Sequence, residues 1–176
     1  MSRSYPDTLK VSRRVLRALI TLNLAMGLAI LALLIASIVA ETWVMTALGA
    51  AHGDVTSNRF LYLGMRLIMV IGIGAVPLTH IVLTRLLAIV ETVRVGDPFV
   101  AENAARLQTI AWMVLGLELL HLAVGAIAAG VSTMAHPLDI DWNFSLTRWL
   151  AVLLLFVLAR VFEHGTRMRD ELEGTV

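Results

Sequence analysis

Three ionisable side chains, Glu118, His121 and Arg148, lie in or beside long apolar stretches of this sequence. Glu118 and His121 are three residues apart, so on a helix they face the same side. Burying an unpaired carboxylate in hydrocarbon costs several kcal/mol of free energy, on the order of the values for charged groups in membranes. This cost predicts that Glu118 pairs with Arg148 and that His121 flanks the pair. The chemistry of this intramembrane polar cluster would be proton transfer or ligand binding. A buried structural pair that fixes helix register is an equally good interpretation.

Depth along the predicted helices supports the pair. With a rise of about 1.5 Å per residue, Glu118 lies roughly 17 Å from an inner boundary at Leu107. Arg148 lies roughly 22 Å from an inner boundary at Glu163 by the same rise. The two side chains are therefore predicted to meet near the middle of the membrane.

Metal and cofactor chemistry has little support. Glu118-Leu-Leu-His121 matches half of a di-iron motif, which requires a second such helix and two further glutamates. His80 and His121 are predicted at depths of roughly 7 and 21 Å, too far apart to share one haem iron. A weak alternative is a metal site in the outer loops. Its ligands would be His52, Asp54, His136, Asp139 and Asp141. We predict no cofactor, no metal, no catalytic residue and no enzyme activity.

Four apolar segments must position these side chains. They cover about residues 15–40, 64–86, 107–131 and 144–163, in a chain that is 59% apolar and 15% charged. Soluble domains are roughly 45–50% apolar and about 25% charged. The sequence therefore predicts an all-α, four-helix transmembrane bundle forming a single membrane domain. The fourth segment is unusual, because only 11 residues separate Arg148 from Arg160.

The basic residues predict the orientation of the bundle. Eleven of them fall on the side of the two termini and the middle loop, and three on the other side. The larger set is Arg3, Lys10, Arg13, Arg14, Arg17, Arg85, Arg94, Arg106, Arg160, Arg167 and Arg169, and the smaller set is Arg59, Arg66 and Arg148. Because positive loops stay in the cytoplasm, both termini are predicted inside, in a multi-pass protein of the inner, cytoplasmic membrane.

Net charge and cysteine content exclude several classes of function. A net charge of +1 does not suit direct nucleic-acid binding, which needs a basic stripe along the backbone phosphates. The chain contains no cysteine, which excludes disulfides and thiolate metal sites. Composition predicts the lipid bilayer as a partner. The sequence is compatible with both a monomer and a homo-oligomer.

The middle loop carries the best candidate for a partner-binding surface. Gly96 is predicted to end one helix, with Asp97 as the N-cap and Pro98 as the first residue of the next. An exposed aromatic residue beside arginine is a common binding anchor. The predicted surface consists of Asp97, Phe99, Glu102, Asn103 and Arg106, with the tail from residue 164 to 173 on the same side. An alternative is that Phe99 only rests at the lipid interface.

Four stretches of the second half resemble a bacterial family of small integral membrane proteins, domain of unknown function 2975. They are residues 96–100 (Gly-Asp-Pro-Phe-Val), 102–107 (Glu-Asn-Ala-Ala-Arg-Leu), 110–112 (Ile-Ala-Trp) and 153–165. The resemblance implies four membrane-spanning helices and a regulatory pairing with a small helix-turn-helix protein of the phage-repressor type. It implies no catalytic residues.

We therefore expect a membrane sensor or anchor for a cytoplasmic partner, a helix-turn-helix transcription regulator. The alternative is a small proton- or ion-coupled transporter or channel that uses Glu118, His121 and Arg148 as a relay.

Overall fold

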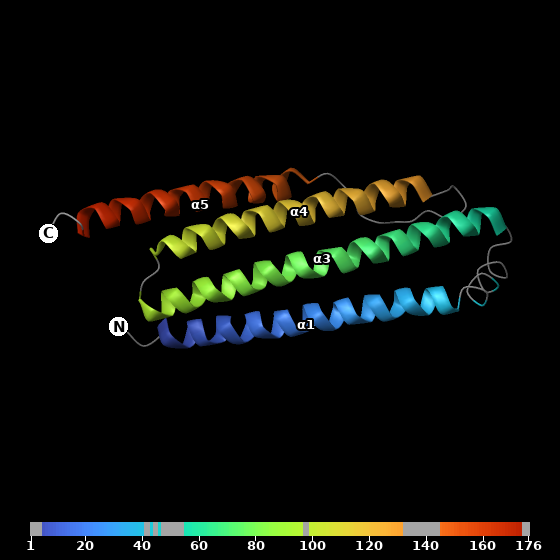
Figure 1. Ribbon diagram of the computed structural model, residues 1–176, viewed down its shortest axis with the longest axis horizontal. Coiled ribbons are helices and arrows are strands. Elements are labelled where there is room, and N and C mark those ends of the chain that lie inside the picture. The colour runs from blue at the N-terminus through green and yellow to red at the C-terminus, as the bar shows by residue number, and fades with distance from the viewer. Residues whose placement is uncertain are drawn as a thin grey trace. The chain divides into compact units, whose positions relative to one another are not determined.

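The computed structural model describes residues 5–40, 43, 46, 55–96, 99–131 and 145–173. Within these ranges the long elements are α1 (Tyr5–Val39), α3 (Val55–Val95), α4 (Ala101–Val131) and α5 (Leu146–Glu173), drawn in Figure 1. No strand occurs in the described part of the chain. The prediction of an all-α fold is therefore confirmed.

Three of these helices are long and apolar enough to cross a membrane: α1 over Lys10–Val39, α3 over Leu61–Val95 and α4 over Ala101–Val131. Each helix exceeds its predicted span, and α3, with 41 residues, is about 60 Å long against a hydrocarbon core of about 30 Å. The crossing by α5 remains a prediction. Its 11-residue interval between Arg148 and Arg160 is short for a span.

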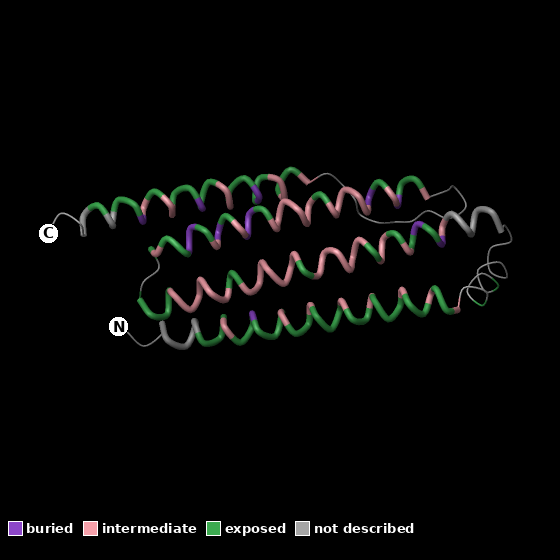
Figure 2. Tube along the Cα trace, viewed as in Figure 1, coloured by how far each residue is buried: buried purple, intermediate pink, exposed green. Residues whose placement is uncertain are grey.

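Large apolar side chains are exposed along the helices. Figure 2 shows that most described residues of α1 and α5 are exposed. Leu28 on α1 and Leu153 on α5 are 67% and 61% exposed. The buried residues of α4 and α5 include small ones, such as Ala111 and Ala159. Exposed large apolar side chains, together with small residues among the buried ones, are typical of helices that pack within lipid.

The backbone contacts divide the chain into two compact units, which we describe separately. Unit 1 comprises residues 1–23, 78–118 and 145–176, and unit 2 comprises residues 24–77 and 119–144. Within unit 1, α1 contacts α3 through Arg13 and Glu91, whose charged atoms lie 3.7 Å apart. In the same unit α4 contacts α5 through Trp112 and Phe156, whose rings pack edge to face at 5.1 Å.

Glycines allow the helix backbones to approach closely. In unit 2, a Cβ atom built at Gly64 on α3 would lie 2.6 Å from Val131 Cγ2 on α4. In unit 1, a Cβ atom at Gly116 would lie 2.8 Å from Leu78 Cδ2, which agrees with the packing expected at small residues of membrane helices.

The turn between α3 and α4 begins where the sequence predicts. Gly96 follows the last residue of α3 and has a φ of +96°, a left-handed conformation that favours glycine. Asp97 and Pro98, predicted as N-cap and first helical residue, lie outside the described residues. Helix α4 begins at Ala101, three residues later than predicted. Its first turn is closed by the Asn103 backbone N–H, which donates to the Val100 carbonyl at 2.9 Å.

Candidate functional site

Glu118 and Arg148 form the predicted ion pair within unit 1. Arg148 Nε lies 3.7 Å from Glu118 Oε2, and the two side chains are 37% and 15% exposed. Glu118 comes from α4, and Arg148 from the first turn of α5, where its backbone N–H donates to the Ser145 carbonyl at 3.0 Å. A cation is unfavourable at the positive end of a helix dipole. The Glu118 carboxylate therefore offsets both the guanidinium charge and the dipole of α5.

His121 follows Glu118 by three residues on α4 and is half-buried. It belongs to unit 2, whereas the ion pair belongs to unit 1. The structure thus brings together Glu118 and Arg148, and a three-residue cluster with His121 stays a prediction.

Among the described residues, no group of three or more histidine, aspartate or glutamate side chains is placed to hold a metal ion. The outer-loop candidates His52, Asp54, His136, Asp139 and Asp141 lie outside the described residues.

The predicted partner-binding residues have different environments in unit 1. Phe99 is 50% exposed and stacks on Phe162 of α5, with ring centroids 5.3 Å apart. Glu102 is exposed and Arg106 is half-buried. Asp97 lies outside the described residues.

Asn103 is completely buried, so the prediction that it belongs to an exposed surface is wrong. Its side-chain amide donates to Thr92 Oγ1 on α3 at 2.7 Å, and its Oδ1 accepts a hydrogen bond from Arg106 Nη1 at 2.7 Å. We call Thr92, Asn103 and Arg106 the α3–α4 clasp. A threonine near the end of one helix and an asparagine early in the next is the signal that could have revealed it.

A second polar cluster, which lies in unit 2, was not predicted from the sequence. Arg66 Nη2 donates to the Ser37 carbonyl at 2.7 Å and to the Tyr62 hydroxyl at 2.6 Å, and that hydroxyl donates to the same carbonyl. The guanidinium carbon of Arg66 also lies 4.3 Å from the centroid of the Tyr62 ring. Because Ser37 is in the last turn of α1, where carbonyls lack helical partners, Tyr62 and Arg66 cap that helix.

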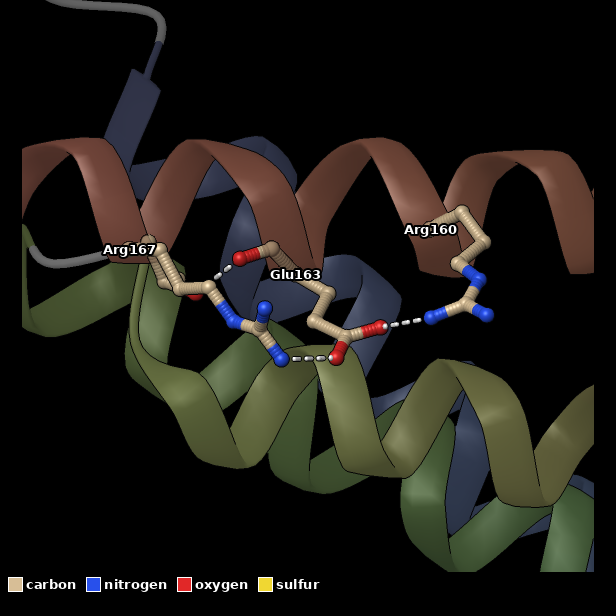
Figure 3. Close-up of polar contacts among 4 residues, drawn as sticks. Arg160, Glu163 and Arg167 are labelled. Atoms are coloured by element: carbon tan, nitrogen blue, oxygen red, sulfur yellow. Dashed lines mark hydrogen bonds and ion pairs between the residues drawn. The ribbon is translucent and has the colours of Figure 1, made fainter.

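The tail of α5 carries a third cluster, shown in Figure 3. Glu163 accepts hydrogen bonds from Arg160 Nη1 at 3.0 Å and from Arg167 Nη2 at 2.8 Å. The two arginines are 82% and 69% exposed, and Glu163 is 38% exposed. Mixed charges at helical spacing predict a solvated helix end, but the spacing does not reveal that one carboxylate orients two guanidinium groups.

Together these observations define an all-α protein with, in its described residues, three apolar helices long enough to cross a membrane and a partly buried ion pair between α4 and α5. Residues 43–176 match the family described as protein of unknown function (DUF2975). The match covers about three quarters of the chain, so the protein belongs to this family and the resemblance is confirmed. No curated protein and no solved structure is similar enough to count as a match.

Proposed function

We propose that this protein is a multi-pass protein of the bacterial inner membrane that anchors a cytoplasmic regulator of the helix-turn-helix type. The observation that carries the proposal is the stack of Phe99 on Phe162, because it leaves a half-exposed aromatic surface at the polar end of unit 1. Exposed Glu102 lies three residues from Phe99, and the charged tail of α5 continues from Phe162. An aromatic centre with a charged rim is typical of protein-binding surfaces. The anchor role needs no enzyme activity.

The proposed topology has four spans, with α5 as the fourth and both termini in the cytoplasm. Arg85, Arg94 and Arg106, predicted on the cytoplasmic side, lie in unit 1 together with Arg160 of α5. Arg66, predicted on the outer side, lies in unit 2. Arg148, also predicted on the outer side, lies in unit 1, so the support for a basic, inward-facing end comes from the larger set of basic residues that shares this unit.

Cysteine labelling tests this topology. We expect cysteines at Ser57 and Asp139 to react with an impermeant thiol reagent applied outside the cytoplasmic membrane, and cysteines at Ser4 and Thr175 to react only after permeabilisation. The chain has no native cysteine to interfere. Labelling of Thr175→Cys but not Ser4→Cys from outside would show that α5 does not cross. Reversed labelling at all four positions would contradict the orientation and leave the number of spans unchanged.

Partner capture tests the anchor. We expect Phe99→Ala, and separately truncation after Gly165, to abolish co-purification of a protein with a helix-turn-helix domain, identified by mass spectrometry from native membranes. Each variant should still insert into the membrane, because Phe99 lies in a turn and the truncation leaves residues 146–165 of α5.

A matched control for Phe99→Ala is Leu153→Ala, which removes an exposed apolar side chain from α5 away from the turn. This variant should retain the partner. Retention of the partner by both Phe99→Ala and the truncated chain would exclude this surface.

A second candidate, a proton- or ion-coupled transporter, is favoured by one observation, the mostly buried Glu118 paired with Arg148. Proton-coupled flux in liposomes that disappears in Glu118→Gln would favour the transporter over the anchor.

A further inference from the structure

Helices α4 and α5 of unit 1 line a partly open hollow of about 520 Å³, which we call the α4–α5 groove. Its lining includes alanines of both helices, among them Ala104 and Ala159, which are 8% and 6% exposed. Because alanine side chains are short, they leave a space between the helices that larger side chains would fill.

The groove is apolar at one end and charged at the other. Trp112 and Phe156, in edge-to-face contact, line the apolar end, and Arg160 and Glu163 line the charged end. Gln108, one helical turn before Trp112 on α4, also lines the groove. From Phe156 to Glu163 is about 10 Å along α5 at the helical rise of about 1.5 Å per residue. Trp112 is 55% exposed, so its ring is accessible to a bound molecule.

The charged end favours an anion. Glu163 accepts from Arg160 on one side and from Arg167 on the other, so two positive charges surround one negative charge (Figure 3). The Arg160 side chain is 82% exposed, which leaves most of its guanidinium accessible while Glu163 holds one edge. An oriented guanidinium with free edges matches the geometry of a phosphate group.

The exposed apolar side chains beside the groove favour a lipid headgroup over free phosphate as the anion. Leu153 and Val157, on the same helix as Phe156 and Arg160, are 61% and 51% exposed. In a membrane these side chains face lipid tails, so a molecule reaching the groove from the side is a lipid.

We propose that the α4–α5 groove binds an anionic glycerophospholipid, with its phosphate on Arg160 and an acyl chain against Trp112 and Phe156. The proposal requires that α5 lies in the membrane but does not depend on a protein partner. A bound anionic lipid would then hold α5 against α4 close to the stacked rings of Phe99 and Phe162.

Fluorescence quenching tests the proposal. In a variant with Trp43, Trp142 and Trp149 replaced by phenylalanine, Trp112 is the remaining tryptophan. The protein is placed in nanodiscs of phosphatidylcholine that contain the same fraction of brominated phosphatidylglycerol or brominated phosphatidylcholine. We expect about five-fold enrichment of the brominated anionic lipid at Trp112, the value for one arginine at an anionic surface. Arg160→Gln should remove this enrichment.

Arg167→Gln is the matched control, because it removes the same charge and the other contact to Glu163 but does not line the groove. It should lower the enrichment less than Arg160→Gln does, because Arg160 remains in the lining while only the neighbouring charge is lost. Ala105→Leu, at an exposed position of the lining, retains both arginines and should reduce quenching by filling the groove. Equal quenching by the two brominated lipids in the parent variant would overturn the proposal. Equal loss in Arg160→Gln and Arg167→Gln would also overturn it, since the effect would then be one of general surface charge.

Discussion

Replacing Arg148 with alanine is expected to lower the free energy of unfolding by about 2 to 3 kcal/mol, because it leaves the Glu118 carboxylate mostly buried and without its ion-pair partner. This is below the loss of about 3 to 5 kcal/mol typical of fully buried pairs, since Arg148 is 37% exposed and water screens part of the interaction. The measurement is unfolding by sodium dodecyl sulfate in mixed micelles. Arg160→Ala, on the same helix and 82% exposed, is the control and should change the free energy by about 0.5 kcal/mol or less.

A double-mutant cycle separates the pair from other effects of the arginine. Glu118→Gln should soften the loss caused by Arg148→Ala, because the neutral amide is less costly to bury than an unpaired carboxylate. Strictly additive effects of the two substitutions would mean that Glu118 and Arg148 do not interact.

Gly64→Ala is expected to destabilise unit 2 by about 1 to 3 kcal/mol, the usual cost of overpacking. The added Cβ would lie 2.6 Å from Val131 Cγ2 and 3.2 Å from both Val131 Cβ and Cγ1. A β-branched valine on a helix has one strongly preferred rotamer and cannot turn away. Helices α3 and α4 would therefore have to separate, which should lower the midpoint of thermal unfolding in mild detergent.

Gly74→Ala is the matched control in the same helix, because a Cβ atom there has no neighbour within 4 Å. This substitution should be neutral or stabilising by up to about 1 kcal/mol through helix propensity. If the two variants unfolded at the same temperature, the contact of Gly64 with Val131 would not exist.

The features that sequence predicted well depend on fixed helical geometry. The constant helical rise per residue predicts that Glu118 and Arg148 lie at similar depth, and the two side chains form an ion pair. The conformational freedom of glycine predicts that α3 ends at Gly96, which has a positive φ. Neither argument requires knowledge of how the helices pack.

The features that sequence missed depend on packing between helices. The sequence predicts Arg66 as the charged boundary of an apolar segment. In the structure Arg66 donates a hydrogen bond to the carbonyl of Ser37, 29 residues earlier. The sequence suggests a polar residue at a helix start for Asn103, whereas the structure shows it completely buried and hydrogen-bonded to Thr92 on the neighbouring helix. The charge pattern of α5 predicts a solvated tail that includes Arg160. It does not reveal the groove beside Arg160, because residues of α4 form the other wall of that groove.

The α3–α4 clasp also has a consequence for the order in which contacts form during synthesis. Thr92 and Asn103 are 11 residues apart, whereas Glu118 and Arg148 are separated by 30. Closing the shorter loop costs on the order of 1 kcal/mol less in chain entropy. The lower cost of the shorter loop, together with its earlier place in the chain, favours formation of the Thr92–Asn103 contact before the Glu118–Arg148 pair.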